Sequence, residues 1–477
     1  MTFYRGIPAA GNCIDPDILL VSVNAGYIHA NLALRWLKAN LAELEPRSGI
    51  LEGTRRLGVD KLADAVEELS PKVIGISVSI WNHFESHELM RRLRRRLPAA
   101  WFVVGGPEAS YLPAEHQLFE YADVLVRGEG ELLFPVLCRE LLAADRPVVP
   151  PGGEVSGLRE LSPCIPDLSA LTLPYSRLQA NDLENRLLYI ETSRGCPFSC
   201  EFCLSSIQGR VRCFPLEPVL DEVRALYERG GRYFKVIDRT FNLDIGRARR
   251  TLELFLELLS SGRNPGAYVQ FEVVPDRLPA ELRDLLSRFP PDTLRLEVGI
   301  QTCNNQVAER INRRQDQHRT MQNLVFLASR TNAIIHADLI IGLPGEDLQS
   351  FAAGFDRLWR LQPGEIQLGV LKALPGTTLR RHDAEWHMLW NPDPPYEIMQ
   401  TRDIDRPTMD ELKAAAKFWE LVVNRGRYPG QVARLLPAAD GTFFRFLEIS
   451  RTLYAHFGRT WGIDAKDIGD ILIKLPT

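Results

Sequence analysis

The hydrophobic and polar positions of this chain form two long stretches in which short apolar runs alternate with amphipathic segments. Short apolar runs predict buried strands, whereas apolar residues that recur every three or four positions predict helices. In the first stretch the predicted strands are 17–23, 73–80, 101–104 and 123–126, and the predicted helices are 30–44, 59–69, 85–97 and 132–144. This alternation predicts an α/β fold with a doubly wound, Rossmann-like parallel sheet, which binds ligands beyond the carboxyl ends of its strands.

The second stretch repeats the same pattern over six units. Its predicted strands are 188–192, 233–237, 269–273, 294–299, 336–341 and 366–371, and its predicted helices are 218–229, 246–260, 279–288, 305–312, 317–331 and 348–361. Six strand–helix units with right-handed crossovers predict a partial (βα)6 barrel. Functional groups of such barrels lie at the carboxyl ends of the strands.

The remaining segments predict a connector and a small helical domain. Residues 147–174 are rich in Pro and Gly and show no sustained periodicity. Helices are predicted at 408–424, capped by Thr408 with Glu411 three residues on, and at 442–458 and 464–475. The aromatic residues Trp386, Trp390 and Tyr396 are predicted to belong to its core. The predicted domains are therefore residues 1–146, a linker at 147–186, a barrel at 187–379 and a helical domain at 380–477.

The composition of the chain limits the classes of partner that we expect it to bind. The 477 residues are 45% hydrophobic and 25% charged with a net charge of −4, so no bulk charge attracts nucleic acid. The basic run 91–96 fits the solvated face of a helix. No apolar segment approaches the roughly 20 residues needed to cross a bilayer, and residues 1–5 lack a signal core, so we expect a cytoplasmic protein without a membrane partner. Clustered cysteines in that compartment favour metal binding over disulfides.

Three cysteines follow the first strand of the second stretch. Cys196, Cys200 and Cys203 have the spacing Cys-x3-Cys-x2-Cys in a loop, which would ligate three corners of a [4Fe–4S] cluster and leave the fourth iron open. A structural cluster or a zinc site, with Cys213 as the fourth ligand, is the alternative. The scattered cysteines are interpreted as ordinary thiols; they are Cys13, Cys138, Cys164 and Cys303.

Polar residues gather at the predicted strand ends of the second stretch. Asp238 follows one strand, Glu272 and Glu297 lie on the next two, and Gln301 follows the last of these. A carboxylate at a strand end can hold an ammonium group or ribose hydroxyls, or it can cap the next helix.

The strand ends of the first stretch carry small residues instead. They are Ser77-x-Ser79, Gly105-Gly106-Pro107-Glu108 and Gly128-Glu129-Gly130. Glycines allow the backbone to approach a ligand closely, although a single pair can also serve only as a tight turn. No Gly-x-Gly-x-x-Gly follows the first strand, so the dinucleotide fingerprint is missing. Together these strand ends favour a large flat ligand.

These motifs resemble the cobalamin-binding domain that precedes many radical S-adenosylmethionine (SAM) enzymes. The resemblance implies that cobalamin binds at Ser77, Ser79, Gly105, Gly106, Pro107, Gly128 and Glu129. The Asp-x-His-x-x-Gly motif, whose histidine ligates cobalt in many such proteins, is absent, because residues 24–29 read Asn-Ala-Gly-Tyr-Ile-His. The resemblance therefore implies base-off cobalamin without a protein histidine on cobalt, with ligation by His29 as the alternative.

Residues 189–379 resemble the radical SAM superfamily. The resemblance implies that the three cysteines of the motif hold the [4Fe–4S] cluster and that SAM contacts Phe202, Asp238, Glu272 and Gln301. The order of the two domains resembles cobalamin-binding radical SAM enzymes, in a subgroup with its own uncharacterised C-terminal helical domain.

The resemblance implies an enzyme in which the cluster cleaves SAM and methylcobalamin methylates an unactivated centre of a small molecule or peptide. An external electron donor such as flavodoxin or ferredoxin is implied. Three alternatives remain: transfer of the 3-amino-3-carboxypropyl group of SAM, a radical rearrangement or cyclisation, and a non-catalytic cobalamin- or redox-responsive binding module. A tRNA substrate is disfavoured, because the chain lacks a second cysteine set and a basic appendage.

Overall fold

The computed structural model describes residues 9–10, 15–144, 157–207 and 209–476. Residues 1–5, Cys13 and the start of the predicted linker, at 147–156, lie outside the described residues. The chain divides into two compact units, one of residues 1–192 and 213–234 and one of residues 193–212 and 235–477. The domain boundaries predicted from the sequence stay a prediction, and each unit is described by itself below.

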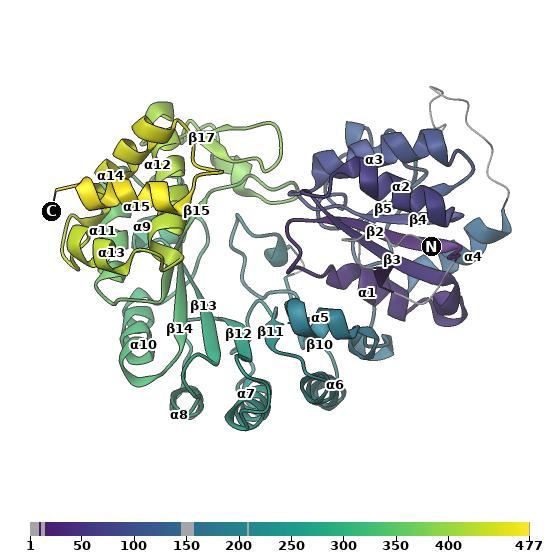
Figure 1. The fold of residues 1–477 in the computed structure, drawn as a ribbon, viewed down its shortest axis with the longest axis horizontal. Helices are drawn as coiled ribbons and strands as arrows, with labels where there is room; N and C mark the ends of the chain where they lie inside the picture. The colour runs from purple at the N-terminus through teal and green to yellow at the C-terminus, as the bar shows by residue number, and fades with distance from the viewer. Residues whose placement is uncertain (1–8, 11–14, 145–156, 208, 477) are drawn as a thin grey trace. The chain divides into compact units, whose positions relative to one another are not determined.

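A seven-stranded sheet forms the centre of the first unit (Figure 1). Its order is β1-β3-β2-β4-β5-β6-β7, and all neighbours are parallel except β1 and β3. The strands are β1 (Ala9–Ala10), β2 (Ile18–Asn24), β3 (Ser48–Thr54), β4 (Val73–Ser77), β5 (Trp101–Gly105), β6 (Val124–Val126) and β7 (Arg159–Leu161). The four predicted strands are confirmed as β2, β4, β5 and β6.

Three strands of this sheet, β1, β3 and β7, were not predicted from the sequence. β3 was not predicted, because its sequence Ser-Gly-Ile-Leu-Glu-Gly-Thr contains a charge and two glycines, yet Glu52 is buried through ion pairs. β7 lies in the segment that was expected to lack periodic structure, and it pairs with β6 at the edge of the sheet. A three-residue edge strand has too few side chains to show a period of two.

Helices cover both faces of this sheet. They are α1 (Leu32–Ala39), α2 (Val59–Leu69), α3 (His83–Arg96) and α4 (Leu133–Ala143), and the unit also contains α5 (Ala180–Asn185) and α6 (Leu216–Glu228). Successive residues of β2 alternate between two cores: Leu19 packs with side chains of α2 and α3, and Leu20 packs with side chains of α1 and α4. The doubly wound, Rossmann-like prediction is thereby confirmed.

The basic run on α3 is not purely a solvated face. Arg94 is buried, donates a 2.8 Å hydrogen bond to Asp123 and lies 3.9 Å from the ring centroid of Phe102. The prediction of a solvated face is wrong at this position, since a carboxylate that is distant in sequence compensates the buried charge.

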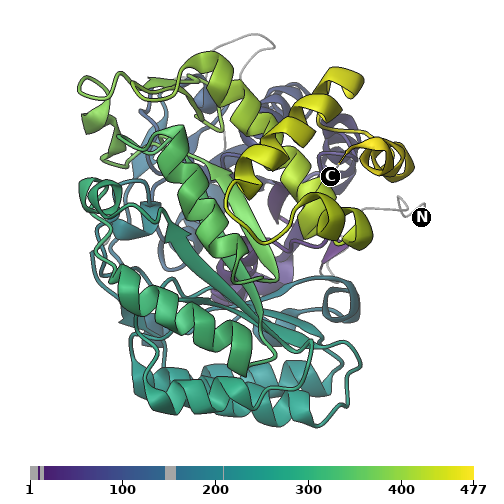
Figure 2. The ribbon, with the colours of Figure 1, turned by 90° about the vertical axis from the view of Figure 1, so that its left-hand side faces the viewer.

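A six-stranded sheet has the order β15-β14-β13-β12-β11-β8. Its strands are β8 (Leu188–Ile190), β11 (Tyr233–Val236), β12 (Tyr268–Val273), β13 (Leu294–Gln301), β14 (Ile334–Ile341) and β15 (Glu365–Val370). Helices α7 (Ile245–Ser260), α8 (Ala280–Ser287), α9 (Asn305–Arg310), α10 (Gln317–Arg330) and α11 (Leu348–Trp359) connect the later strands. Figure 2 shows the long connecting helices along the outside of these strands. Strands β12 to β15 pair with one another in parallel, as expected for a partial barrel.

The C-terminal region is largely helical. It contains β16 (Leu389–Trp390), β17 (Ile398–Gln400), α12 (Arg406–Trp419), a π-helical turn (Glu420–Asn424), α13 (Pro429–Leu435), α14 (Thr442–Phe457) and α15 (Ala465–Lys474). Trp419 is fully buried and contacts Phe355 of α11 and Phe446 of α14 edge-on. Trp386, Trp390 and Tyr396 are buried, as predicted.

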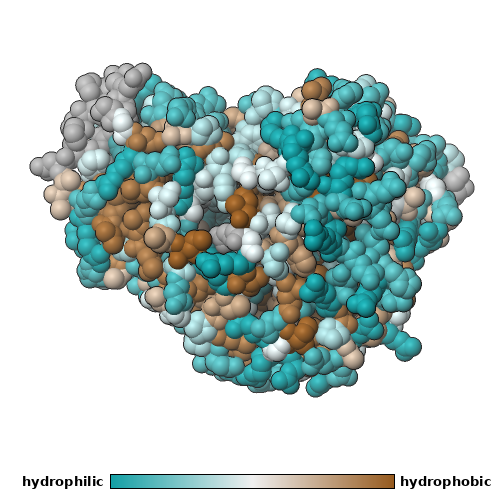
Figure 3. All heavy atoms as spheres, turned by 180° about the vertical axis from the view of Figure 1, so that it is seen from behind, coloured by the Kyte–Doolittle hydropathy of each residue, from teal (hydrophilic) through white to brown (hydrophobic). Residues whose placement is uncertain are grey.

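The predicted cap of the first helix in this region is wrong. Asp405 is the N-cap residue, and its carboxylate accepts a 3.0 Å hydrogen bond from the backbone N–H of Thr408. Pro407 fits the first turn of a helix, so α12 begins before the residue that was taken as its cap. Within the described residues, no helix is long and apolar enough to cross a membrane. On the face of the molecule in Figure 3, hydrophilic side chains predominate and hydrophobic ones form separate patches.

Candidate functional site

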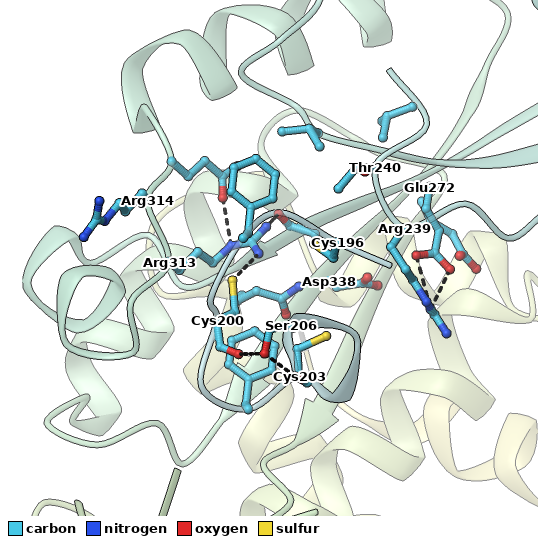
Figure 4. Close-up of a pocket in the computed structure, with 18 of the residues that line it drawn as sticks. Cys196, Cys200, Cys203, Ser206, Arg239, Thr240, Glu272, Arg313, Arg314 and Asp338 are labelled. Carbon is cyan, nitrogen blue, oxygen red and sulfur yellow. Dashed lines mark hydrogen bonds and ion pairs between the residues drawn. The ribbon is translucent and has the colours of Figure 1, made fainter. Parts of the chain in front are cut away.

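The three cysteines of the motif lie on the wall of one cavity of the second unit. The cavity has a volume of about 290 Å³ and is also lined by residues from β12 to β15 (Figure 4). Cys196 and Cys200 are buried and Cys203 is half-buried. The hydroxyl of Ser206 donates to the carbonyl oxygens of Cys203, at 2.6 Å, and Cys200, at 3.1 Å. These bonds hold the loop in the shape that presents the thiols to the cavity.

A second set of contacts anchors the same loop. The carboxylate of Glu201, between two of the cysteines, is buried and lies 2.8 Å from Nε2 of His382. Arg381 forms an ion pair with the same carboxylate. The backbone N–H of Glu201 also donates to the carbonyl of Ile311. The loop is therefore tied to the segment after β15 and to the end of α9.

The electrostatics of the thiols fit a metal cluster. Burial raises the pKa of Cys196 and of Cys200, and the neighbouring cysteines raise it further. The guanidinium of Arg313, whose Nη1 lies 3.7 Å from Sγ of Cys200, lowers the pKa of Cys200. Thiols that are costly to ionise alone are stabilised as thiolates once they bind iron.

The donor set fits an iron–sulfur cluster. Three cysteines line the wall of one cavity, and thiolates are the usual protein ligands of [4Fe–4S] clusters. Cys213, the alternative fourth ligand, is exposed.

The predicted SAM residues divide into two groups. Phe202, Glu272 and Gln301 line the cavity together with the cysteines. Asp238 does not line it; this carboxylate is buried and accepts a 2.8 Å hydrogen bond from the hydroxyl of Ser193. Three of the four predicted SAM residues therefore line one cavity. Asp238 instead accepts a hydrogen bond from the segment that leads into the cysteine loop.

Two carboxylates of the cavity have cationic partners. Arg239 Nη1 lies 3.0 Å from Oε1 of Glu272, as Figure 4 shows. Lys235 Nζ lies 2.6 Å from Oε1 of Glu297, which also accepts a hydrogen bond from Gln270. These pairs compensate the charges of two of the carboxylates that line the cavity.

Other cavity residues were missed from the sequence. Arg313, Asp338 and Gln367 line the cavity, and Arg314 extends away from the cysteines (Figure 4). A signal was present for Asp338, because it is the one carboxylate in the largely apolar strand β14, Ile-Ile-His-Ala-Asp-Leu-Ile-Ile. Arg313 lies in a loop beyond α9, so no periodic pattern marks it.

Asp338 differs from the other cavity carboxylates. Its Oδ1 is buried and has no hydrogen-bond partner among the described residues. Burial and the charges of Glu297 and Glu272 raise the pKa of Asp338 to about 7, against the opposing effect of Lys235 and Arg313. A carboxylate in this state is available to a ligand.

The predicted cobalamin residues lie at one edge of the first sheet, after β4, β5 and β6. Ser77 and Ser79 are buried, and the backbone N–H of Ser79 donates to Oδ1 of Asn82. Gly106 has φ +110°, and a Cβ there would lie 2.5 Å from the carbonyl oxygen of Val78. Only glycine fits this position, because two backbone segments pass each other.

The same edge of the first unit has features that suit a flat ligand. Gly128 donates its backbone N–H to the hydroxyl of Ser110, Pro107 is exposed and Glu129 is half-buried. Four large apolar side chains that follow β2 and β4 are 42–49% exposed; they are Tyr27, Ile28, Trp81 and Phe84. Nδ1 of His29 lies 2.6 Å from the hydroxyl oxygen of Tyr189, so this nitrogen already has a partner. An apolar rim around a glycine-lined edge fits a corrin ring.

Two family profiles match the chain. The B12 binding domain matches residues 18–137, and the Radical SAM superfamily matches residues 190–358. They cover the sheet edge and the cavity described above.

Two curated relatives and one solved structure are similar. The chain is 27% identical over 349 residues to 2-(S-pantetheinyl)-carbapenam-3-carboxylate methyltransferase of Streptantibioticus cattleyicolor, covering 66% of this chain and 50% of the relative. It is 28% identical over 351 residues to the cobalamin-dependent radical SAM methyltransferase TokK of Streptomyces tokunonensis, covering 67% and 50%. The chain thus spans about half the length of these relatives.

The fold is similar to that of the radical SAM methyltransferase TsrM from Kitasatospora setae, solved with tryptophan substrate and a SAM analogue bound. The TM-score is 0.61 at 19% identity, and the match covers 79% of this chain and 78% of TsrM.

Proposed function

The chain belongs to the cobalamin-binding radical SAM family, and from this premise we propose that it methylates an unactivated centre of a small molecule or peptide. The curated relatives, of which the chain spans half, are both named methyltransferases. An external electron donor such as flavodoxin or ferredoxin serves the reaction in a reducing cytoplasm.

The cysteine loop is the part of the chain that holds the cluster in this proposal. Cys196, Cys200 and Cys203 ligate three irons, and the hydrogen bonds of Ser206 and the ion pairs of Glu201 keep their thiols on the cavity wall. When bound, the [4Fe–4S] cluster supplies the electron that cleaves SAM, and cobalamin supplies the methyl group. Arg313 lines the same cavity beside Cys200 and would compensate part of the negative charge of the thiolates.

SAM is proposed to bind on the same wall. Phe202 offers an aromatic face and Glu272 and Gln301 offer hydrogen-bonding groups within one cavity. The positive φ of Gln301, +71°, turns this side chain at the end of β13. Asp238 serves as a positioning residue, because its carboxylate holds Ser193 before the first cysteine.

Cobalamin is proposed to bind at the edge of the first sheet, on Ser77, Ser79, Gly105, Gly106, Pro107, Gly128 and Glu129. The tight turn at Gly106 and the exposed apolar rim support this assignment. Base-off binding without a cobalt-ligating histidine is proposed, since residues 24–29 lack the Asp-x-His-x-x-Gly motif.

The observation that carries the proposal is the convergence of three thiols and a set of polar strand-end residues on one cavity. The test is anaerobic incubation of the reconstituted protein with cobalamin, SAM and a reductant, followed by identification of the SAM fragments and of methylated products among candidate substrates. Deoxyadenosine with a methylated product supports the proposal. Methylthioadenosine would instead identify transfer of the 3-amino-3-carboxypropyl group, and intact SAM beside a fully loaded cluster would identify a binding module.

A further inference from the structure

A second pocket of this unit lies beside the cavity that the cysteines line. It has a volume of about 600 Å³ and is formed by the loop after β12, by α8 and by α10. Asp276 lines both the pocket and the cavity. Arg277 lines the pocket, and its guanidinium carbon lies 5.6 Å from the ring centroid of Phe198, which lines the cavity. A molecule bound in the pocket can therefore extend toward the cysteines.

This second pocket, called the arginine pocket below, has a positively charged lining. It contains the guanidinium groups of Arg277, Arg283 and Arg319 and one carboxylate, that of Asp276. Among the described residues, neither Arg277 nor Arg283 forms an ion pair. Arg319 lies 3.5 Å from Asp316, but both side chains are largely exposed, so this pair compensates little of the charge. The arginine pocket therefore favours an anionic ligand.

Arg283 of α8 is held in place by α10. Its Nη2 donates a hydrogen bond to Oδ1 of Asn323, and its guanidinium carbon lies 5.2 Å from the ring centroid of Phe326. Asn323 is buried and donates in turn to the carbonyl oxygen of Pro275, at 2.7 Å. The Nε of Arg283 is buried and has no acceptor among the described residues. The guanidinium is therefore ordered before a ligand binds, which lowers the entropy cost of binding an anion.

We propose that the arginine pocket binds a phosphate group of the substrate, whose reacting part lies in the cysteine-lined cavity. The inference rests on the proposed function, because it takes that cavity to be the place of methyl transfer. A phosphate monoester fits better than a carboxylate, since it has three terminal oxygens and nearly two negative charges at neutral pH. One guanidinium fork satisfies a carboxylate, whereas a phosphate can accept hydrogen bonds from two or three guanidinium groups.

The test uses phenyl phosphate as the probe and benzoate as its monoanionic counterpart, each titrated calorimetrically into the cluster-reconstituted full chain. Phenyl phosphate should bind about tenfold more tightly than benzoate. Arg277→Gln and Arg283→Gln should each weaken phenyl phosphate binding about tenfold, as expected for the loss of a charge-assisted hydrogen bond. Arg288→Gln, the same change at the exposed residue that ends α8 and does not line the pocket, should leave the affinity unchanged.

Unchanged iron content shows that the variants are folded, and Arg277 is exposed, so its replacement disturbs no core. Equal binding of phenyl phosphate by the unchanged protein and by both pocket variants would overturn the proposal, as would equal affinities for phenyl phosphate and benzoate. The affinities for SAM and for hydroxocobalamin, measured by equilibrium dialysis, should be the same in the variants as in the unchanged protein. Loss of either affinity would assign the arginines to a cofactor and would also overturn it.

A final arm connects the arginine pocket to the substrate. A phosphorylated substrate should lose about tenfold in kcat/KM when its phosphate is removed, and Arg277→Gln should lose the same factor on the phosphorylated compound but nothing on the dephosphorylated one. Equal kcat/KM values of the unchanged protein for the two compounds would overturn the inference and leave the proposed function intact. Phenyl phosphate binding needs no methyl transfer, so the proposed function can fail while the phosphate site is confirmed.

Discussion

Glu52 of β3 and Arg186, which precedes β8, form an ion pair of 2.7 Å in which both side chains are only 2% exposed. Arg35 of α1 lies 3.0 Å from the same carboxylate, and the backbone N–H of Asn31 donates to it. Asp182, also buried, lies 3.4 Å from Arg35 and 3.5 Å from Arg186, so Glu52 is the nearer of two carboxylates that compensate these guanidinium groups. The segment that carries Arg186 continues through β8 toward the cysteine loop.

Glu52→Gln should destabilise the first unit by about 3–5 kcal/mol, because it leaves two buried arginines without their main counter-charge. The free energy of unfolding by urea, followed by circular dichroism, measures the change. The control is Glu45→Gln, which breaks a partly exposed pair with Arg177 and should cost less than about 1 kcal/mol. Equal losses of unfolding free energy in the two variants would contradict the role of Glu52 as the main counter-charge of the two buried arginines.

Acid should weaken the same network. Burial by itself would raise the pKa of Glu52, but the charges of Arg35 and Arg186 lower it to about 2, from 4.5 in the unfolded chain. A depressed folded-state pKa contributes stability that is complete above the unfolded value and is lost as the pH falls toward 2. The stability difference between the unchanged protein and Glu52→Gln should therefore shrink between about pH 4.5 and pH 2. A constant difference over this range would argue against the network.

Replacing Cys196, Cys200 or Cys203 by alanine should abolish stable iron incorporation, because two thiolates no longer enclose the cluster. Iron and sulfide analysis with the visible absorption spectrum of the reconstituted protein measures this loss. Cys164→Ala removes an exposed cysteine of the first unit and should retain the cluster. A triple cysteine variant that kept its iron and still cleaved SAM would refute the cluster assignment.

Gly106→Ala should remove cobalamin binding, because its Cβ would meet the backbone of Val78 at 2.5 and 2.9 Å. Equilibrium binding of hydroxocobalamin, followed by absorbance, provides the measurement. Gly58→Ala is the matched control: φ is +84° there, but no atom lies within 4 Å of the added Cβ. It should lose about 1 kcal/mol of stability and keep cobalamin. Cobalamin binding by Gly106→Ala at unchanged affinity would contradict the proposed site.

Gly299→Ala should weaken SAM binding about tenfold, because the added Cβ displaces Gln301 and Arg313 and thereby removes a hydrogen bond to the ligand. Gly369→Ala on β15 is the control, since its Cβ would make only an ordinary 3.5 Å contact. SAM affinity is measured by equilibrium dialysis on the reconstituted proteins. If both variants bound SAM equally well, Gln301 would not belong to the SAM site.

Local patterns determined most of the fold. All six strands of the partial barrel and their helices follow from short apolar runs and helical periodicity. The elements that were missed carry no such signal. β7 has three residues, and α12 begins at Arg406, capped by Asp405, rather than after Thr408. Several residues near the end of a helix can serve as its cap, and the sequence pattern does not show which of them does.

By itself, the sequence determined the cysteine motif, the glycine-rich strand ends and the alternation of strands and helices, because these depend on residues close together along the chain. Only the tertiary structure decided which charges meet. It buried Glu52 between Arg35 and Arg186, paired Glu272 with Arg239, and left Asp338 without a donor. Whether a carboxylate is a structural partner or is available to a ligand depends on donors from distant strands, and no spacing in the sequence records them.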